Sequence, residues 1–146
     1  MYGAVLDANV YVSAIIRPEG PPGEIIERFV RDRAFDLVLS GAIAEEVLRA
    51  LAYPKVRKCI RRKIDPTLWF ENIFLLARVV PGEYKVSGVS RDPDDDKCLA
   101  AAVEGRCQYA VTGDPDLLVL EHHDDVQIVS PKTFLDLLRA SRPAST

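Results

Sequence analysis

Four acidic residues stand at separate places along the chain, namely Asp7, Glu46, Asp95 and Asp114. Three of the four directly adjoin an apolar stretch whose pattern predicts a buried strand or helix. An ionised carboxylate beside such an element loses hydration, and several carboxylates close together repel one another. A bound divalent cation is the simplest way to offset both costs, and hard cations such as Mg²⁺ prefer oxygen ligands. These residues therefore predict a metal site.

Aspartates are most crowded between residues 92 and 96, where four of the five positions carry one. Asp92 as N-cap, Pro93 at the first helical position and acids in the first turn are also ordinary features of a helix start, so capping alone is an alternative interpretation. One cap and one acid facing the helix dipole would suffice, however, and the remaining repulsion calls for a cation. Asp95 lies four residues before Leu99 and so borders the buried stripe of the predicted helix, whereas Asp94 is expected to point to solvent.

The glutamate pair Glu45 and Glu46 lies in a second predicted helix. The two residues fall on opposite shoulders of the apolar stripe formed by Ile43, Val47 and Leu51, so helical periodicity does not choose between them. A solvated glutamate on a helix flank is the simpler interpretation for either residue taken alone.

The aspartate pair Asp114 and Asp116 lies in the segment TGDPDLL at 112–118. These residues could form a turn and cap the short helix that follows, which is a structural role without chemistry. They could equally bring two more carboxylates to the metal site. The residues alone leave both interpretations open.

The elements that must position these acids follow from hydrophobic periodicity. Apolar runs predict strands over 4–6, 35–39, 79–80, 109–112 and 126–129, and a further apolar run spans 10–16. Amphipathic patterns predict helices over 24–30, from the capping Ser40 to the residue before Pro54, over 66–76, around 99–103, over 117–120 and over 134–138. Residues 17–23, with three prolines and two glycines, are predicted to form a loop.

Short apolar strands without polar alternation, separated by amphipathic helices, are typical of a parallel sheet covered on both faces. The sequence therefore predicts an α/β fold, a three-layer α/β/α sandwich with a central parallel sheet. In such sheets ligands collect at the carboxyl ends of the strands, near the switch in strand order. Asp7 and Asp114 each fall within two residues of a predicted strand end, so we expect both at that rim.

Composition limits the other possibilities. The length of 146 residues predicts one domain over 1–140, followed by a disordered tail over 141–146. No apolar stretch approaches the length of a membrane span, and the start has no leader-like pattern, so we expect a soluble cytoplasmic protein without membrane contact. Three cysteines without CxxC spacing predict free thiols rather than disulfides or zinc.

The net charge of −3 excludes binding of nucleic acid by bulk positive charge. One basic run stands out, made of Lys55, Arg57, Lys58, Arg61, Arg62 and Lys63. Any basic binding surface must therefore be local, and a solvated helix face is an equally simple interpretation of this run. Trp69 could stack a nucleobase, but its helical spacing with Phe70 and Ile73 favours packing in the core.

Four motifs occur in a definite order: LDANV at 6–10, Ser40 followed by Glu46, DPDD at 92–95, and TGDPDLL at 112–118. In this order and spacing the chain resembles the PIN-domain family, of the VapC-like type found as toxins in type II toxin–antitoxin systems. The resemblance runs from about residue 3 to residue 138. It implies the sandwich fold inferred above and a hydrolase, namely a Mg²⁺- or Mn²⁺-dependent endoribonuclease.

The resemblance also implies roles for particular residues. The acids that match the family's active site are Asp7, Glu46, Asp95 and Asp114, with Asp116 as a frequent fifth acid, Asn9 and Thr112 as polar support, and Asp7, Asp95 and Asp114 as the metal ligands. The family pattern favours Glu46 over Glu45. Two positions depart from it: Gly41 stands where a proline is common, and Asp96 adds an acid that blurs which side chain of its cluster meets the metal.

Partners and rival functions follow from the same comparison. The resemblance implies an RNA substrate, a cognate antitoxin protein and a homodimer. The basic run offers a candidate RNA-binding rim beside the acidic site, made of Lys55, Arg57, Lys58, Arg61 and Arg62. A haloacid-dehalogenase-like phosphatase is a weaker alternative, because it needs a second aspartate where Asn9 stands. A catalytically weak PIN-fold module that binds RNA or protein is the other alternative.

Overall fold

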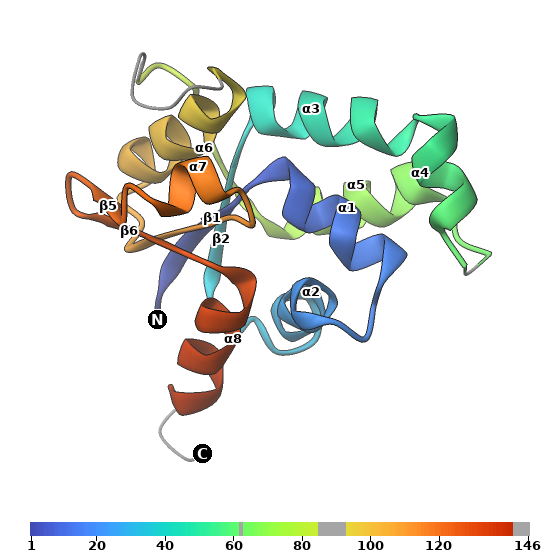
Figure 1. The fold of residues 1–146 in the computed structure, drawn as a ribbon, viewed down its shortest axis with the longest axis horizontal. Coiled ribbons are helices and arrows are strands. Elements are labelled where there is room, and N and C mark those ends of the chain that lie inside the picture. Colours follow the sequence, from blue (N-terminus) through green and yellow to red (C-terminus); the bar gives the residue numbers. More distant parts are fainter. Residues whose placement is uncertain (62, 85–92, 142–146) are drawn as a thin grey trace.

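The computed structural model describes residues 1–61, 63–84 and 93–141, with side chains described from residue 96 in the last range. Its centre is a six-stranded sheet in the order β3-β2-β1-β4-β6-β5 (Figure 1). The strands are β1 (Gly3–Leu6), β2 (Asp36–Ser40), β3 (Arg78–Val80), β4 (Tyr109–Val111), β5 (His122–His123) and β6 (Val126–Val129). All neighbouring strands pair in parallel except β5, which pairs antiparallel with β6. The α/β sandwich expected from the sequence is therefore confirmed.

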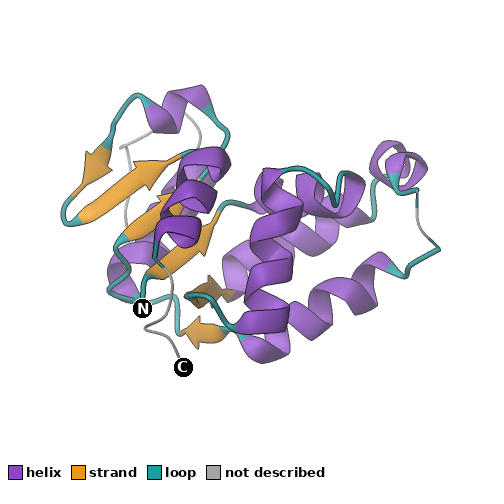
Figure 2. Ribbon diagram, turned by 90° about the horizontal axis from the view of Figure 1, so that it is seen from below, coloured by secondary structure: helices purple, strands orange, loops and turns teal. Residues whose placement is uncertain are grey.

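Eight helices surround this sheet in the described part of the chain. They are α1 (Ala8–Ile16), α2 (Pro21–Asp32), α3 (Gly41–Leu51), α4 (Pro54–Cys59), α5 (Pro66–Leu76), α6 (Pro93–Glu104), α7 (Pro115–Leu118) and α8 (Pro131–Ala140). Helices α1 to α5 gather on one side of the sheet, and α6 packs against β1, β2 and β4 on the other (Figures 1 and 2).

Burial on both faces explains why the central strands read as continuous apolar runs. All four residues of β1 are buried, and the side chains of Leu37, Val38 and Leu39 in β2 are fully enclosed. In the adjoining helical layer the Tyr11 and Phe70 rings meet edge to face at 5.3 Å between centroids. Such a sheet can expose function only at its edges, where the strands end.

Helix capping sets several of the boundaries. Ser40 Oγ accepts a hydrogen bond from the Ile43 N–H at 3.2 Å, which starts α3 as predicted. Asp65 Oδ1 accepts the N–H groups of Thr67 and Leu68 at 3.0 and 3.3 Å, which starts α5 as predicted. In the first turn of α2, Glu24 joins its own helix to α8 through Arg139, with 2.9 Å between the carboxylate and the guanidinium.

Three local predictions were wrong or incomplete. The loop expected over 17–23 ends early, because Pro21 and Pro22 occupy the first positions of α2, where a missing N–H costs nothing. Helix α4 was not predicted, since it is only six residues long and none of them is buried. Strand β5 was missed because two residues carry no periodic signal. The expected disordered tail lies outside the described residues from 142 onward.

The described helices include none with the length and apolar character of a membrane-spanning segment.

Candidate active site

The carboxyl ends of β1 and β4 bring two distant segments together. These strands are parallel neighbours, and Leu6 pairs with Val111. The Asp7 N–H extends the ladder by donating to the Val111 carbonyl at 2.9 Å. The strand order also switches direction here, because β2 and β3 lie on one side of β1 and β4 on the other. Asp7 and Thr112 therefore stand side by side at the position where open α/β sheets bind ligands.

Asp7 is a buried carboxylate, 5% exposed, at the N-cap position of α1. Unlike most N-cap aspartates, it makes no side-chain cap hydrogen bond. Its Oδ2 instead accepts a hydrogen bond from the Thr112 hydroxyl at 2.8 Å, across from β1 to β4. The fold therefore directs this carboxylate to the rim of the sheet rather than to its own helix.

Thr112 connects Asp7 to Asp114. The Asp114 N–H donates to Thr112 Oγ1 at 3.0 Å, so the hydroxyl proton is left for Asp7. A hydroxyl oriented in this way stabilises the ionised form of a carboxylate. The completely buried Thr112 thus links the polar groups that follow β1 and β4.

Asp114 has a structural role as well as a place at this rim. Its Oδ1 accepts the Asp116 N–H at 2.9 Å and caps the short helix α7, as the structural interpretation predicted. Within the described part of the chain, Oδ2 accepts no hydrogen bond. Asp116 itself is exposed. Capping therefore uses one oxygen of Asp114 and leaves the other available.

The two glutamates of α3 differ in their surroundings. Glu45 is exposed and lies 3.7 Å from the guanidinium of Arg49 in an ion pair on the helix surface. Glu46 is half-buried. Asn9, expected as polar support, is exposed in the first turn of α1. The structure therefore distinguishes two glutamates that helical periodicity could not.

Helix α6 presents a buried acid that the sequence reasoning did not select. Asp96 is 6% exposed, three residues before the fully buried Leu99. The side chain of Asp95, the predicted ligand, lies outside the described residues. Asp96 lies three residues before Leu99 and Asp95 lies four before it, and both spacings place a residue on the same helix face as Leu99. The sequence pattern therefore favoured burial of either residue equally.

A comparison with known families decides the class of protein. Residues 3–116 match the model of the PIN domain. The chain belongs to the PIN-domain family. The uncharacterized protein MJ1680 of Methanocaldococcus jannaschii is also similar, with 27% identity over 140 residues, which cover 90% of this chain and 88% of the relative. PIN domains are a nuclease family that typically uses divalent metals, so the acidic rim is the candidate active site.

The donor chemistry of this PIN domain fits such a metal. The candidate ligands are carboxylate oxygens, which Mg²⁺ and Mn²⁺ prefer, and histidine is absent from the set. Among the described side chains, no group of three or more acidic, histidine or cysteine residues is close enough to hold an ion by itself. Two of the candidate ligand residues are nevertheless linked through the Thr112 hydroxyl, Asp7 by its carboxylate and Asp114 by its backbone N–H.

The basic run of this PIN domain lies on and after α4. Lys55, Arg57 and Lys58 are exposed on the helix, and Arg61 and Lys63 are exposed beyond it. Arg62 lies outside the described residues. Because none of the α4 side chains is fully buried, this helix offers a wide cationic surface. Solvation explains the exposure as well as a ligand would, so exposure alone does not assign a role.

Proposed function

We propose that this PIN domain is a metal-dependent endoribonuclease that hydrolyses phosphodiester bonds in RNA. The observation that supports it most directly is the buried Asp7 carboxylate, which accepts its hydrogen bond from Thr112 on the neighbouring strand instead of capping its own helix. Such an arrangement is poor for stability, since a buried carboxylate loses hydration. It is well suited to a ligand that the carboxylate must meet in a fixed position.

In the proposed mechanism Asp7, Asp95 and Asp114 would hold Mg²⁺ or Mn²⁺, with Asp96 as a further candidate from the same helix. When bound, the ion supplies a water of lowered pKa and neutralises charge on the phosphate. Glu46 orients the attacking water or takes its proton, and the hydrogen bond from Thr112 holds the Asp7 carboxylate in place. Attack of the water oxygen on phosphorus breaks the bond to the 3′ oxygen, which takes up a proton from solvent, leaving a 5′-phosphate and a 3′-hydroxyl.

We also propose that the protein acts as the toxin of a toxin–antitoxin pair and forms a homodimer. The motif resemblance described above supports this proposal. The antitoxin would cover the acidic rim and so control access of RNA. Co-expression with the product of an adjacent short reading frame tests it: a stable complex with inhibited cleavage is expected, and unchanged cleavage in the mixture contradicts it.

The test of the nuclease proposal compares two neighbouring glutamates. Purified protein is incubated with single-stranded RNA and Mg²⁺ or Mn²⁺, with EDTA as the metal-free control. Glu46→Gln should reduce cleavage by about 10²-fold or more, the usual effect of losing a group that assists proton transfer, whereas Glu45→Gln should cleave like the wild type. Asp7→Asn should abolish cleavage while the protein stays folded.

One result would contradict the role of Glu46, and another would contradict the nuclease proposal itself. Equal cleavage by the Glu46 and Glu45 variants would remove Glu46 from the mechanism. An absence of cleavage with every metal and RNA, together with retained RNA binding, would favour the catalytically weak binding module instead.

A further inference from the structure

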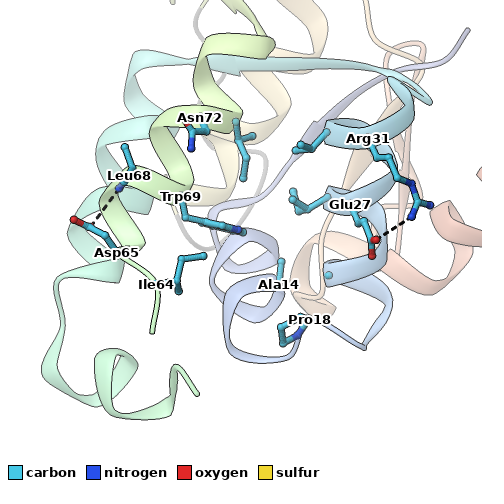
Figure 3. A pocket seen from close by; sticks show the side chains of 13 residues that line it. Ala14, Pro18, Glu27, Arg31, Ile64, Asp65, Leu68, Trp69 and Asn72 are labelled. Atoms are coloured by element: carbon cyan, nitrogen blue, oxygen red, sulfur yellow. Dashed lines mark hydrogen bonds and ion pairs between the residues drawn. The ribbon is translucent and has the colours of Figure 1, made fainter. Parts of the chain in front are cut away.

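A concave cavity of about 490 Å³ lies between α2 and α5, and its lining includes neither Asp7 nor Asp114 of the acidic rim (Figure 3). Its floor includes Ala14 of α1, and its walls carry apolar side chains from both helices, such as Ile26 and Leu68. Trp69 extends from α5 toward α2 across this space. A cavity of this size and apolar character is within the range that small ligands occupy.

Polar groups stand at the rim of the cavity with unused hydrogen-bonding capacity. Asp65 uses Oδ1 to cap α5, while its Oδ2 accepts no hydrogen bond within the described residues. The exposed Asn72 also lines the cavity and makes no hydrogen bond to the described part of the chain. On the opposite wall Glu27 and Arg31 pair with each other at 3.0 Å. The apolar wall and the few polar edges together resemble a site for a flat molecule with a polar perimeter.

The cavity continues toward the basic helix. A second hollow of about 400 Å³ is lined by Ile64 and Asp65, which also line the first, and by Arg57 of α4. Residues 54–63 contain six lysines and arginines and no acid. The apolar cavity is therefore adjacent to a cationic strip of the kind that follows a phosphate backbone.

We propose that this cavity receives an unpaired base of a single-stranded polynucleotide, stacked on Trp69, while the adjoining phosphates lie along α4. The inference rests on the proposed function for the identity of the polymer as RNA, and it adds a binding site outside the acidic rim. The cavity floor at Ala14 lies two helical turns beyond Asp7 on α1, roughly 10 Å along the helix axis. A single strand could therefore contact both places.

Charge favours a base rather than a phosphate inside the cavity. The lining carries two acids, Glu27 and Asp65, against one cation, Arg31, so a phosphate would be repelled there and attracted to α4. An amine on the edge of a base can donate to a carboxylate oxygen, as cytosine does to aspartate. We therefore expect bases with an exocyclic amine to bind more tightly than uracil.

Trp69 is the single tryptophan of the chain, so its fluorescence reports on this cavity alone. The protein is titrated in EDTA with oligocytidylate, with oligouridylate and with an abasic strand of equal length. Stacking predicts strong quenching by oligocytidylate, weaker quenching by oligouridylate and none by the abasic strand. Equal fluorescence with all three strands, while anisotropy of a labelled strand reports binding, would overturn the proposal.

Substitutions test the same site through a fluorescein-labelled oligocytidylate. Trp69→Leu should weaken binding by roughly five- to hundredfold, the factor that corresponds to one base–aromatic stack. Leu75→Ala is the matched control, since Leu75 is 80% exposed on the same helix and lines neither cavity. Thermal unfolding checks that both variants are folded. Unchanged affinity in folded Trp69→Leu protein would overturn the proposal.

Asn72→Ala gives a second test that does not disturb the core, because Asn72 is exposed. It should reduce the preference for cytidylate over uridylate, because the side-chain oxygen of Asn72 is a further acceptor for an exocyclic amine at the rim of the cavity. A protein ligand is the competing occupant: concentration-dependent dimerisation that Leu68→Lys abolishes, with no quenching by any strand, would assign the cavity to a second copy of the chain and overturn the proposal.

The outcomes separate this inference from the proposed nuclease function. Metal-dependent cleavage without quenching would refute base binding at Trp69 and leave the nuclease proposal intact. Quenching with the expected base preference but without cleavage would refute the nuclease proposal and support the cavity as a binding site.

Discussion

The bond between Thr112 and Asp7 yields the sharpest prediction on stability. Thr112→Val keeps the branched shape of the side chain and removes its hydroxyl. The Asp7 carboxylate then loses a 2.8 Å hydrogen bond in a place that is 5% exposed, and the Asp114 N–H loses its acceptor. A hydrogen bond to a charged group contributes about 1.5–3 kcal/mol, and the second bond is only partly buried. We expect the variant to be less stable by about 2–3 kcal/mol.

Urea unfolding at neutral pH measures this loss, and thermal unfolding should show a midpoint lower by roughly 5–10 °C for a chain of this length. Thr133→Val is the matched control, because Thr133 is exposed at the start of α8 and, within the described residues, its hydroxyl oxygen accepts one exposed hydrogen bond, from the Ser130 hydroxyl. That variant should stay within about 0.5 kcal/mol of the wild type.

A double-mutant cycle isolates the contact itself. In the Asp7→Asn background the acceptor is no longer charged, so Thr112→Val should cost about 1 kcal/mol less than it does in the wild type. If Thr112→Val unfolds at the same urea concentration as the Thr133→Val control, or if the two substitutions are strictly additive, the reasoning that Thr112 holds a charged Asp7 is refuted.

Three further predictions concern the interior. The Tyr11 hydroxyl is buried and has no hydrogen-bond partner among the described residues, so Tyr11→Phe should raise the free energy of unfolding, measured in urea, by about 1 kcal/mol. A lower free energy of unfolding would show that the hydroxyl is satisfied. Gly23→Ala should destabilise by about 1–3 kcal/mol in the same assay, because an added Cβ would overlap the Pro18 carbonyl, and an unchanged midpoint would contradict that packing. Burial raises the pKa of the Cys107 thiol to about 12. At pH 8 a thiol reagent should therefore react with one exposed thiol, Cys59, in native protein and with three thiols in urea. Rapid reaction of all three thiols without denaturant would contradict the burial.

The fold was predictable for elements that are specified by an apolar run or by a capping residue. The apolar run of β1 and the capping residues Ser40 and Asp65 specify their elements locally, and the structure confirms them. Elements held by neither signal were missed: α4 has no buried residue, and β5 exists only through its pairing with β6. An element can be predicted from its own residues only when the burial or capping of those residues determines it.

The candidate site was predictable at the strand ends and less so on the helices. The placement of Asp7 and Asp114 was predicted from parallel strands that end at one rim, and β1 and β4 are such a parallel pair. Thr112 came only from the family resemblance. On a helix each residue is rotated by 100° from the one before it. Two adjacent acids on opposite sides of the apolar stripe therefore have the same predicted burial. Glu46 is half-buried and Glu45 exposed, and Asp96 is buried, because of how their helices pack against other elements. The sequence of one helix does not specify that packing.

Only one oxygen of Asp114 caps α7, and this affects how the proposed metal ligand should be mutated. Alanine would remove the acceptor that caps the start of α7. A loss of cleavage in Asp114→Ala would then have two explanations, a disordered turn or the missing carboxylate. Asparagine can still offer a carbonyl to the Asp116 N–H while it replaces the other oxygen with an amide. Asp114→Asn therefore tests the chemical role of the side chain without removing the helix cap.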